Sequence, residues 1–141
     1  NAGFIRMRAR EQPKRLLVFA LDGKAEMPLS GNTDRPVPLA VPSFKVDKEK
    51  ALAGRATFNS VCFLCHGPSA VSGGGAPDLR SSGVPLSYDA MSSVIRDGAM
   101  LERGMPIFDE LSDEDIVNLQ HYIRMRAEDA LGSAVEDGVN K

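Results

Sequence analysis

The sequence predicts an all-α domain that is preceded by an isolated β-strand segment and a proline-rich linker. Three observations support this fold class. From Asp47 onward, apolar residues recur at the three- and four-residue spacing of a helix. The chain after residue 46 contains no strand pattern. The one strand-like run, Arg15 to Gly23, is separated from the helical part by the proline-rich stretch from Pro28 to Phe44.

Composition limits the classes of function. The chain has 141 residues, 43% of them hydrophobic and 26% charged, with a formal net charge of −2. The slight negative charge argues against nucleic acid or an anionic membrane as the main partner. The longest apolar run, Leu16 to Leu21, is too short to cross a bilayer, so we expect no transmembrane segment. Because the chain starts at Asn1 without a methionine, we expect that processing or truncation removed what preceded it.

Charge divides the chain into two parts. Residues 1–28 carry six Lys or Arg and three Asp or Glu, a net charge of +3, whereas the remaining residues carry eleven and sixteen, a net charge of −5. This asymmetry indicates two parts of different origin. We therefore expect a terminal strand segment over 1–28, a linker over 29–45, a helical domain over 46–132 and a C-terminal tail over 133–141.

The run from Arg15 to Gly23, RLLVFALDG, is apolar on both faces and closes with the turn-forming pair Asp22-Gly23. Such a strand is typical of a larger sheet, because one strand cannot bury itself. A short buried helix is the weaker alternative, since a glycine follows the run at once. We expect the strand to belong to a partner sheet, and residues 1–44 to contribute little to the stability of the helical domain.

The first helix is predicted by four residues that share one helical face, namely Ala51, Gly54, Phe58 and Val61. Asp47 is placed to cap its N-terminus. A glycine inside a helix costs about 1 kcal/mol relative to alanine. We therefore expect another helix to cross very close to Gly54.

Two further helices follow. One is predicted from Ser87 to Asp97, with Gly98 as its C-cap. Its inward residues are Met91, Val94 and Ile95. The other starts at a capping box formed by Ser112 to Asp115, and we expect it to stop at Leu131-Gly132. Its buried stripe consists of Ile116, Leu119 and Ile123, with Tyr122 at the border.

The segment VCFLCHG holds the only two cysteines of the chain, Cys62 and Cys65, and His66 follows directly. A structural zinc site needs four ligands and a redox pair needs a preceding strand, so both are disfavoured. A simple disulfide would leave His66 unexplained. Cys-x-x-Cys-His is the attachment signature of haem c, in which both thiols form thioethers and the histidine binds the iron. We predict one covalent haem held by these three residues.

A second axial ligand is available downstream. Met91 lies on an apolar helix face, which is typical of a core residue. His121 lies two residues from Leu119 on the last helix, so we expect it to face water. Met105 lies in the irregular segment RGMPIF, from which a loop can carry its thioether over the far face of the haem. We predict Met105 as the sixth ligand, with Met100 or an open position as alternatives.

Three stretches, GRATFNSVCFLCHG, GGGAPDLR and RDGAMLERGMPIFDELSDEDIVNLQHYI, together resemble a class I c-type cytochrome. More narrowly, they resemble the C-terminal cytochrome domain of quinohaemoprotein alcohol dehydrogenases. The resemblance covers roughly residues 45–130. The segment RLLVFALDG is similar to the closing strand of the eight-bladed propeller that holds pyrroloquinoline quinone (PQQ) in those enzymes, whereas the rest of that propeller has no counterpart here. The resemblance implies a cytochrome c-like helical domain around one covalent haem.

The resemblance also implies roles for single residues. Pro77 matches the proline whose carbonyl accepts the proton of the axial histidine. Arg80 is a candidate partner for a haem propionate, because a guanidinium pairs with a carboxylate in a fork. Gly54 and Phe58 match the pair that packs against an aromatic residue of the last helix, here Tyr122.

The function implied by the resemblance is electron transfer. A His/Met-ligated haem c would take electrons from reduced PQQ, held with Ca²⁺ only in a partner propeller domain, and pass them to an external acceptor such as a cytochrome, a copper protein or a quinone. The family implies a periplasmic location. This chain alone should not oxidise an alcohol. The alternative is a haem enzyme or sensor with an open or displaceable sixth position.

Overall fold

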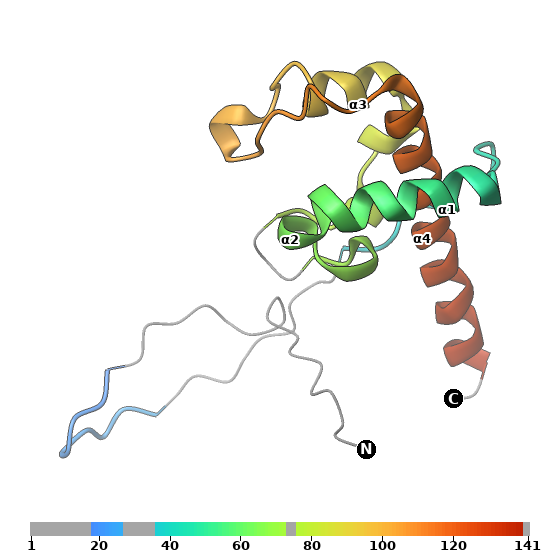
Figure 1. Cartoon of the computed structure of the whole chain (residues 1–141). Coiled ribbons are helices and arrows are strands. Elements are labelled where there is room, and N and C mark those ends of the chain that lie inside the picture. The colour runs from blue at the N-terminus through green and yellow to red at the C-terminus, as the bar shows by residue number, and fades with distance from the viewer. Residues whose placement is uncertain (1–17, 27–35, 73–75, 140–141) are drawn as a thin grey trace. The chain divides into compact units, whose positions relative to one another are not determined.

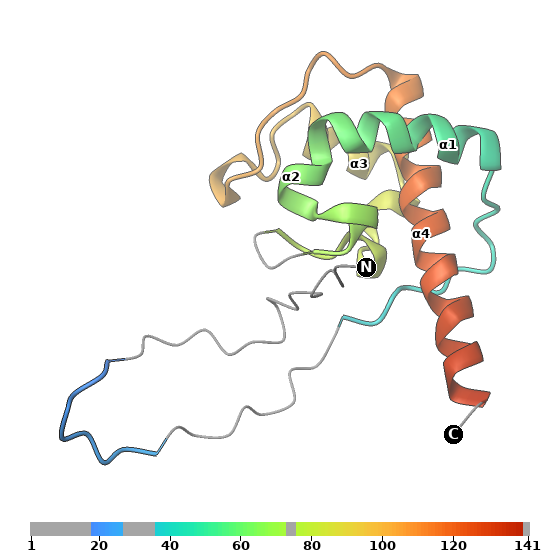
Figure 2. The same cartoon turned by 60° about the horizontal axis from the view of Figure 1, so that its bottom comes forward.

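The computed structural model of the chain describes residues 18–26, 36–72 and 76–139. The chain forms two compact units, residues 1–35 and residues 36–141, and each is treated by itself. Figures 1 and 2 show the second unit from two directions, and in both views α1 crosses α4.

In the first unit, residues 18–26 form no strand. The side chains of Val18, Phe19 and Leu21 are exposed, and the Gly23 N–H donates to the Ala20 carbonyl at 3.1 Å. The turn at Asp22-Gly23 is therefore confirmed, whereas the isolated strand is not seen. A strand is defined by hydrogen bonds to a neighbouring strand, and no described residue supplies one. Residues 15–17 of the predicted strand lie outside the described part of the chain.

The second unit is helical, and its described residues include no strand, which confirms the all-α prediction. Its main helices are α1 (Lys48–Thr57), α2 (Phe63–His66), α3 (Tyr88–Ile95) and α4 (Asp113–Val139). A π-helical turn, η1 (Phe58–Cys62), joins α1 to α2. Short 3₁₀ turns lie between the helices: η2 (Pro68–Ala70), η3 (Leu79–Ser81), η4 (Val84–Leu86) and η5 (Leu101–Arg103). Among the described residues, no helix combines the length and apolarity needed to cross a membrane.

Helix α1 crosses α4 at Gly54, as predicted. The Asp47 carboxylate caps α1 by accepting from the N–H groups of Glu49 at 2.9 Å and Lys50 at 3.2 Å. A Cβ placed on Gly54 would lie 2.0 Å from the Asn118 carbonyl oxygen of α4, so only glycine fits this crossing.

One turn beyond this crossing, the Phe58 ring packs on the Tyr122 ring with centroids 5.0 Å apart. The core around them consists of Phe58, Ala70, Met91, Ile95, Ile116, Leu119, Tyr122 and Ile123. The predicted contact of the first helix with Tyr122 is therefore present.

The π-helical turn changes the face that the end of α1 presents. Val61 was predicted inward at α-helical spacing, but it is only half-buried, and Cys62 packs against the core instead. A π-helical turn contains an extra residue, which rotates the following side chains relative to their positions in an α-helix. The chain then continues from α1 into α2 (Figure 2).

The last helix begins as predicted and ends later. Ser112 Oγ accepts from the Asp115 N–H at 3.1 Å, and the Asp115 carboxylate accepts from the Ser112 N–H at 3.0 Å, which completes the capping box. The stop expected at Gly132 is wrong, because α4 continues to Val139. Gly132 has no φ that favours a stop and simply lies within the helix.

Residues 36–47, which we call the strap, lie against the helical unit. The Leu39 N–H donates to the Arg80 carbonyl at 2.9 Å, and the Leu39 carbonyl accepts from Arg124, whose side chain is 1% exposed. Two other nitrogens of Arg124, Nε and Nη1, are buried without a partner among the described residues. The strap overlaps residues 1–44, which we expected to contribute little to the stability of this unit, and these contacts make that expectation testable.

The strap also contacts His121. The Asp47 N–H donates to His121 Nδ1 at 3.0 Å, and the Phe44 ring lies 5.2 Å from the His121 ring. Burial, followed by the charge of Lys50, lowers the pKa of His121, which favours the neutral ring that accepts this bond. The expectation that His121 faces water was wrong, because the strap covers that side of α4.

The crossing at Gly54 can be tested with a matched pair of glycines. We expect Gly54→Ala to lower the free energy of unfolding by about 2 kcal/mol or more, because the new methyl group must push α4 away. Gly132→Ala, at a helical position where the added Cβ would meet nothing within 4 Å beyond the adjoining backbone of its own helix, should raise the stability by about 0.5–1 kcal/mol. Urea unfolding followed by circular dichroism measures both, and equal effects would contradict the close crossing.

The strap can be tested by shortening the chain. A chain that begins at Val46 removes the Leu39 carbonyl and leaves the buried Arg124 guanidinium without it, so we expect a loss of about 1–3 kcal/mol relative to a chain that begins at Pro36. The urea midpoints of the two chains give the measurement. Identical midpoints would show that the strap does not stabilise the helical unit.

Candidate haem-attachment site

The Cys-x-x-Cys-His motif lies on two consecutive helical elements. Cys62 is the last residue of η1, and Cys65 and His66 end α2. Because residues three apart in a helix lie on the same side, the two thiols are neighbours on one surface. Gly67 ends α2 with a φ of 75°, and its N–H donates to the Phe63 carbonyl at 2.8 Å. The positive φ is well suited to glycine and turns the chain away directly after His66.

Both thiols are free, which is the form that thioether formation requires. Cys65 is exposed, whereas Cys62 is half-buried and packs against the apolar core. Burial, with a smaller contribution from Cys65, raises the pKa of the Cys62 thiol to about 11. Cys62 is therefore a neutral thiol near pH 7, and its sulfur belongs to an apolar surface.

His66 is oriented by a backbone carbonyl. The side chain is 9% exposed, and its Nδ1 lies 3.0 Å from the Pro77 carbonyl oxygen. A carbonyl oxygen can only accept, so Nδ1 carries the proton and Nε2 keeps a free lone pair. Such a bond fixes the ring and raises its basicity as a metal ligand. The Pro77 carbonyl therefore lies at hydrogen-bonding distance from the His66 ring.

Arg80 is held by its own turn. Its Nε and Nη2 donate to the Asp78 carboxylate at 3.0 and 2.8 Å, and the Asp78 carboxylate also accepts from the Arg80 N–H at 3.1 Å. Asp78 is buried and caps η3. A guanidinium has five N–H donors, so Arg80 keeps donors for a second carboxylate such as a propionate. Asp78 was not predicted from the sequence, although an Asp at the start of a turn is a capping signal.

Met105 follows a tight helix end. The Gly104 N–H donates to the Leu101 carbonyl at 2.9 Å, and the Met105 N–H donates to the Met100 carbonyl at 3.2 Å. This pair of bonds is a Schellman motif, and Gly104 adopts its left-handed position with a φ of 88°. The half-buried Met105 and Cys62 both pack against the same core cluster. The structure therefore places the predicted thioether ligand and one attachment cysteine around one apolar cluster.

The other candidates occupy different positions. Met91 is 5% exposed and is a core residue, as predicted. His121 is engaged by the Asp47 N–H and the Phe44 ring. Met100 is half-buried, and its carbonyl accepts from Arg103 and Met105, so its backbone supports the turn that carries Met105.

The donor set fits a haem better than a bare metal ion. No group of three or more His, Cys, Asp or Glu residues that could hold a metal ion occurs among residues 18–26, 36–72 and 76–139. Instead, the Cys62 thiol and the Met105 thioether pack against the apolar core, and the Cys65 thiol and the oriented His66 imidazole follow Cys62 in the chain. Phe63 and Leu64, inside the motif, are 45% and 88% exposed. These features suit a flat apolar group attached through sulfur.

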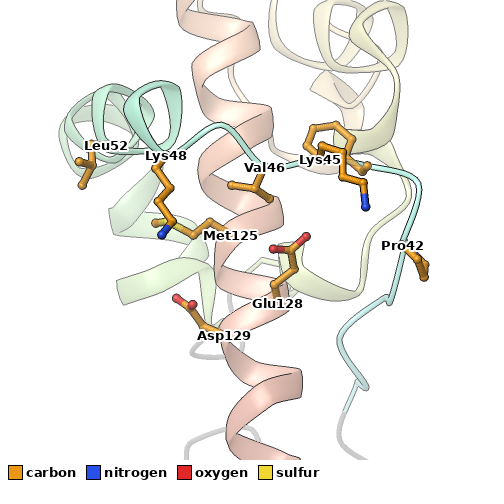
Figure 3. Close-up of a pocket in the computed structure, with 9 residues that line it drawn as sticks. Pro42, Lys45, Val46, Lys48, Leu52, Met125, Glu128 and Asp129 are labelled. Atoms are coloured by element: carbon orange, nitrogen blue, oxygen red, sulfur yellow. The ribbon is translucent and has the colours of Figure 1, made fainter.

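A groove of about 560 Å³ lies elsewhere, between the strap, the start of α1 and α4 (Figure 3). Lys45 and Lys48 face Glu128 and Asp129 across it, and Met125 lies at its floor. None of the predicted haem ligands lines this groove. It is therefore distinct from the attachment site.

The chain is similar to several known proteins. The family model described as "Cytochrome C oxidase, cbb3-type, subunit III" matches residues 49–123. The chain is 34% identical over 79% of its length to quinohemoprotein alcohol dehydrogenase ADH IIB of Pseudomonas putida. It is 41% identical over 82% of its length to lupanine 17-hydroxylase [cytochrome c] of a Pseudomonas species.

A third relative is the dehydrogenase subunit of the quinone-type alcohol dehydrogenase of Gluconobacter oxydans, at 31% identity over 86% of the chain. In all three cases the match covers only 16% of the relative. The chain therefore spans about a sixth of the length of these curated relatives.

Proposed function

This chain belongs to the cytochrome c family represented by subunit III of cbb3-type cytochrome c oxidase, and from that premise we propose that it transfers single electrons through one covalently attached haem c. The observation that carries the proposal is the bond between His66 Nδ1 and the Pro77 carbonyl, 3.0 Å long, within a Cys-x-x-Cys-His motif. This bond leaves Nε2 with a free lone pair, through which His66 would bind the iron.

Each residue of the site has a role in this proposal. The sulfurs of Cys62 and Cys65 would hold the group through thioethers, and His66 Nε2 and the Met105 sulfur would bind its iron. Arg80 offers its remaining N–H donors to a propionate. When bound, haem c supplies a one-electron couple between ferric and ferrous iron. Ligation from both sides favours electron transfer over ligand binding, and a thioether ligand raises the reduction potential.

The donor is proposed from the relatives, two of which are named alcohol dehydrogenases and one a hydroxylase. The haem would receive electrons one at a time from a reduced PQQ held with Ca²⁺ in a dehydrogenase domain. An external cytochrome, copper protein or quinone would accept the electrons, and the periplasm is the expected compartment. Residues 1–28 would then be the terminal strand of the partner propeller, 29–45 the linker, 46–132 the cytochrome domain and 133–141 its tail.

Covalent attachment is tested on the matured protein. We expect haem to remain with the polypeptide through acid-acetone extraction and denaturing electrophoresis, because two thioethers hold it. The double variant Cys62→Ser/Cys65→Ser should lose haem completely in the same procedure. Complete extraction of haem from the unmodified chain would remove the basis of this proposal.

The sixth ligand is tested with two methionines of one segment. Met105→Ala should abolish the weak long-wavelength absorption band of a methionine-ligated ferric haem and allow carbon monoxide to bind the ferrous iron, because the iron loses its thioether. The reduction potential should also fall. Met100→Ala serves as the control and should change neither property. The reverse pattern would identify Met100 as the ligand, and a carbon monoxide-reactive unmodified protein would favour the sensor or enzyme alternative.

A further inference from the structure

The two ends of the segment that carries Met105 are joined to each other. It runs from Arg96, after α3, to Ser112, before α4. Arg96 Nε donates to the Leu111 carbonyl at 2.8 Å, and Arg96 Nη1 donates to the Asp113 carboxylate at 2.7 Å. One guanidinium at the start of the segment therefore binds two groups at its end.

The same junction is reinforced from α3. The Phe108 N–H donates to the Ile95 carbonyl at 2.8 Å. Tyr88, the first residue of α3, donates its hydroxyl to the Asp113 carboxylate at 2.7 Å. The bonds from Tyr88 and Arg96 lower the pKa of Asp113, so the carboxylate stays ionised and able to accept both. Arg96, Tyr88 and Asp113 form one network, which we call the clamp.

The part of the segment directly before Met105 has few buried contacts. Residues 101–104 are exposed, and Leu101 shows 53% of its surface to solvent. Met105 is half-buried and packs against the core cluster, as do Phe108 and Leu111 nearer the end of the segment, and the methyl end of Ile107 lies close to Gly98. Segments with few buried contacts open locally at low free-energy cost. The position of Met105 therefore depends strongly on how firmly the ends are joined.

We propose that Arg96 is a positioning residue that keeps Met105 on the haem iron by joining the two ends of its segment. This proposal rests on the function proposed above, in which Met105 is the sixth ligand. Arg96 touches neither the iron nor the electron partner in this scheme. It shifts the balance between a closed segment, with Met105 bound, and an open one.

The two bonds of Arg96 differ in exposure. The Asp113 side chain is 78% exposed, so the ion pair is screened by water and salt. The Arg96 side chain is 23% exposed, and its bond to the Leu111 carbonyl is partly buried. We therefore assign the larger share of the positioning effect of Arg96 to its bond with the Leu111 carbonyl, which the loss of Asp113 alone would leave intact.

The experiment measures how often Met105 leaves the iron. Carbon monoxide binding to the ferrous holoprotein requires the sixth position to open, so its rate reports the open fraction. Arg96→Gln should bind carbon monoxide about fivefold faster than the unmodified protein, since it loses a charge-assisted bond and a screened ion pair. Arg96→Lys, which keeps the charge but not the fork, should lie between the two, and Asp113→Asn should give a smaller increase.

A matched control lies on α4. Arg126 pairs with Asp129 at 2.7 Å, the same separation as in the clamp, but on a part of the helix away from the Met105 segment. Arg126→Gln should leave the carbon monoxide rate and the long-wavelength band unchanged. If Arg96→Gln behaves like Arg126→Gln, Arg96 does not position Met105. If Arg96→Gln fails to fold around haem, Asp113→Asn must still show the increase, or the proposal is wrong.

The outcomes separate this proposal from the one on which it rests. If the unmodified protein lacks the long-wavelength band and binds carbon monoxide as fast as Met105→Ala, Met105 is not the ligand and the proposed function fails. If Met105→Ala loses the band but Arg96→Gln matches the unmodified rate, only the positioning role fails. An accelerated rate in Arg96→Gln with an unchanged urea midpoint would support positioning over a general loss of stability.

Discussion

The crossing of α1 and α4 at Gly54 is the constraint on which the rest of the helical unit depends. Because a Cβ there would lie 2.0 Å from the Asn118 carbonyl oxygen, the two backbones touch. This close approach brings Phe58 of η1 onto Tyr122 of α4, with ring centroids 5.0 Å apart. The end of the first helix is thereby fixed against the core, and the attachment motif begins one turn later.

The π-helical turn η1 determines which side chain after α1 packs against the core. Its extra residue per turn brings Cys62 onto the core cluster, whereas Val61 would have taken that place in a continuous α-helix. Gly67 then turns the chain, and the Pro77 carbonyl receives the ring of His66. A second chain segment brings Met105 to the same cluster through the left-handed Gly104. Thus each of the two predicted iron ligands depends on one glycine and one backbone carbonyl.

Local signals in the sequence were sufficient for much of this architecture. The cap at Asp47, the crossing at Gly54 and the capping box at Ser112 were all predictable, because each depends on residues within one turn or on the small size of glycine. The prediction failed where contacts between distant residues decide the structure. The strap covers His121, and no periodicity in α4 could reveal it. The end of α4 was also misplaced, because Gly132 costs the helix little when nothing else breaks it.

Two arginines hold the irregular segments that the helices leave unsupported. Arg96 donates to the Leu111 carbonyl and Arg124 to the Leu39 carbonyl. In the described part of this unit no strand supplies donors to such carbonyls, so side chains must do so. Burial lowers the pKa of Arg124, yet a guanidinium remains charged near neutral pH and presents its donors in a rigid plane. Since the acceptor is backbone in both cases, the side chains of Leu39 and Leu111 take no part in these bonds, and the side-chain chemistry of each bond is supplied by the arginine.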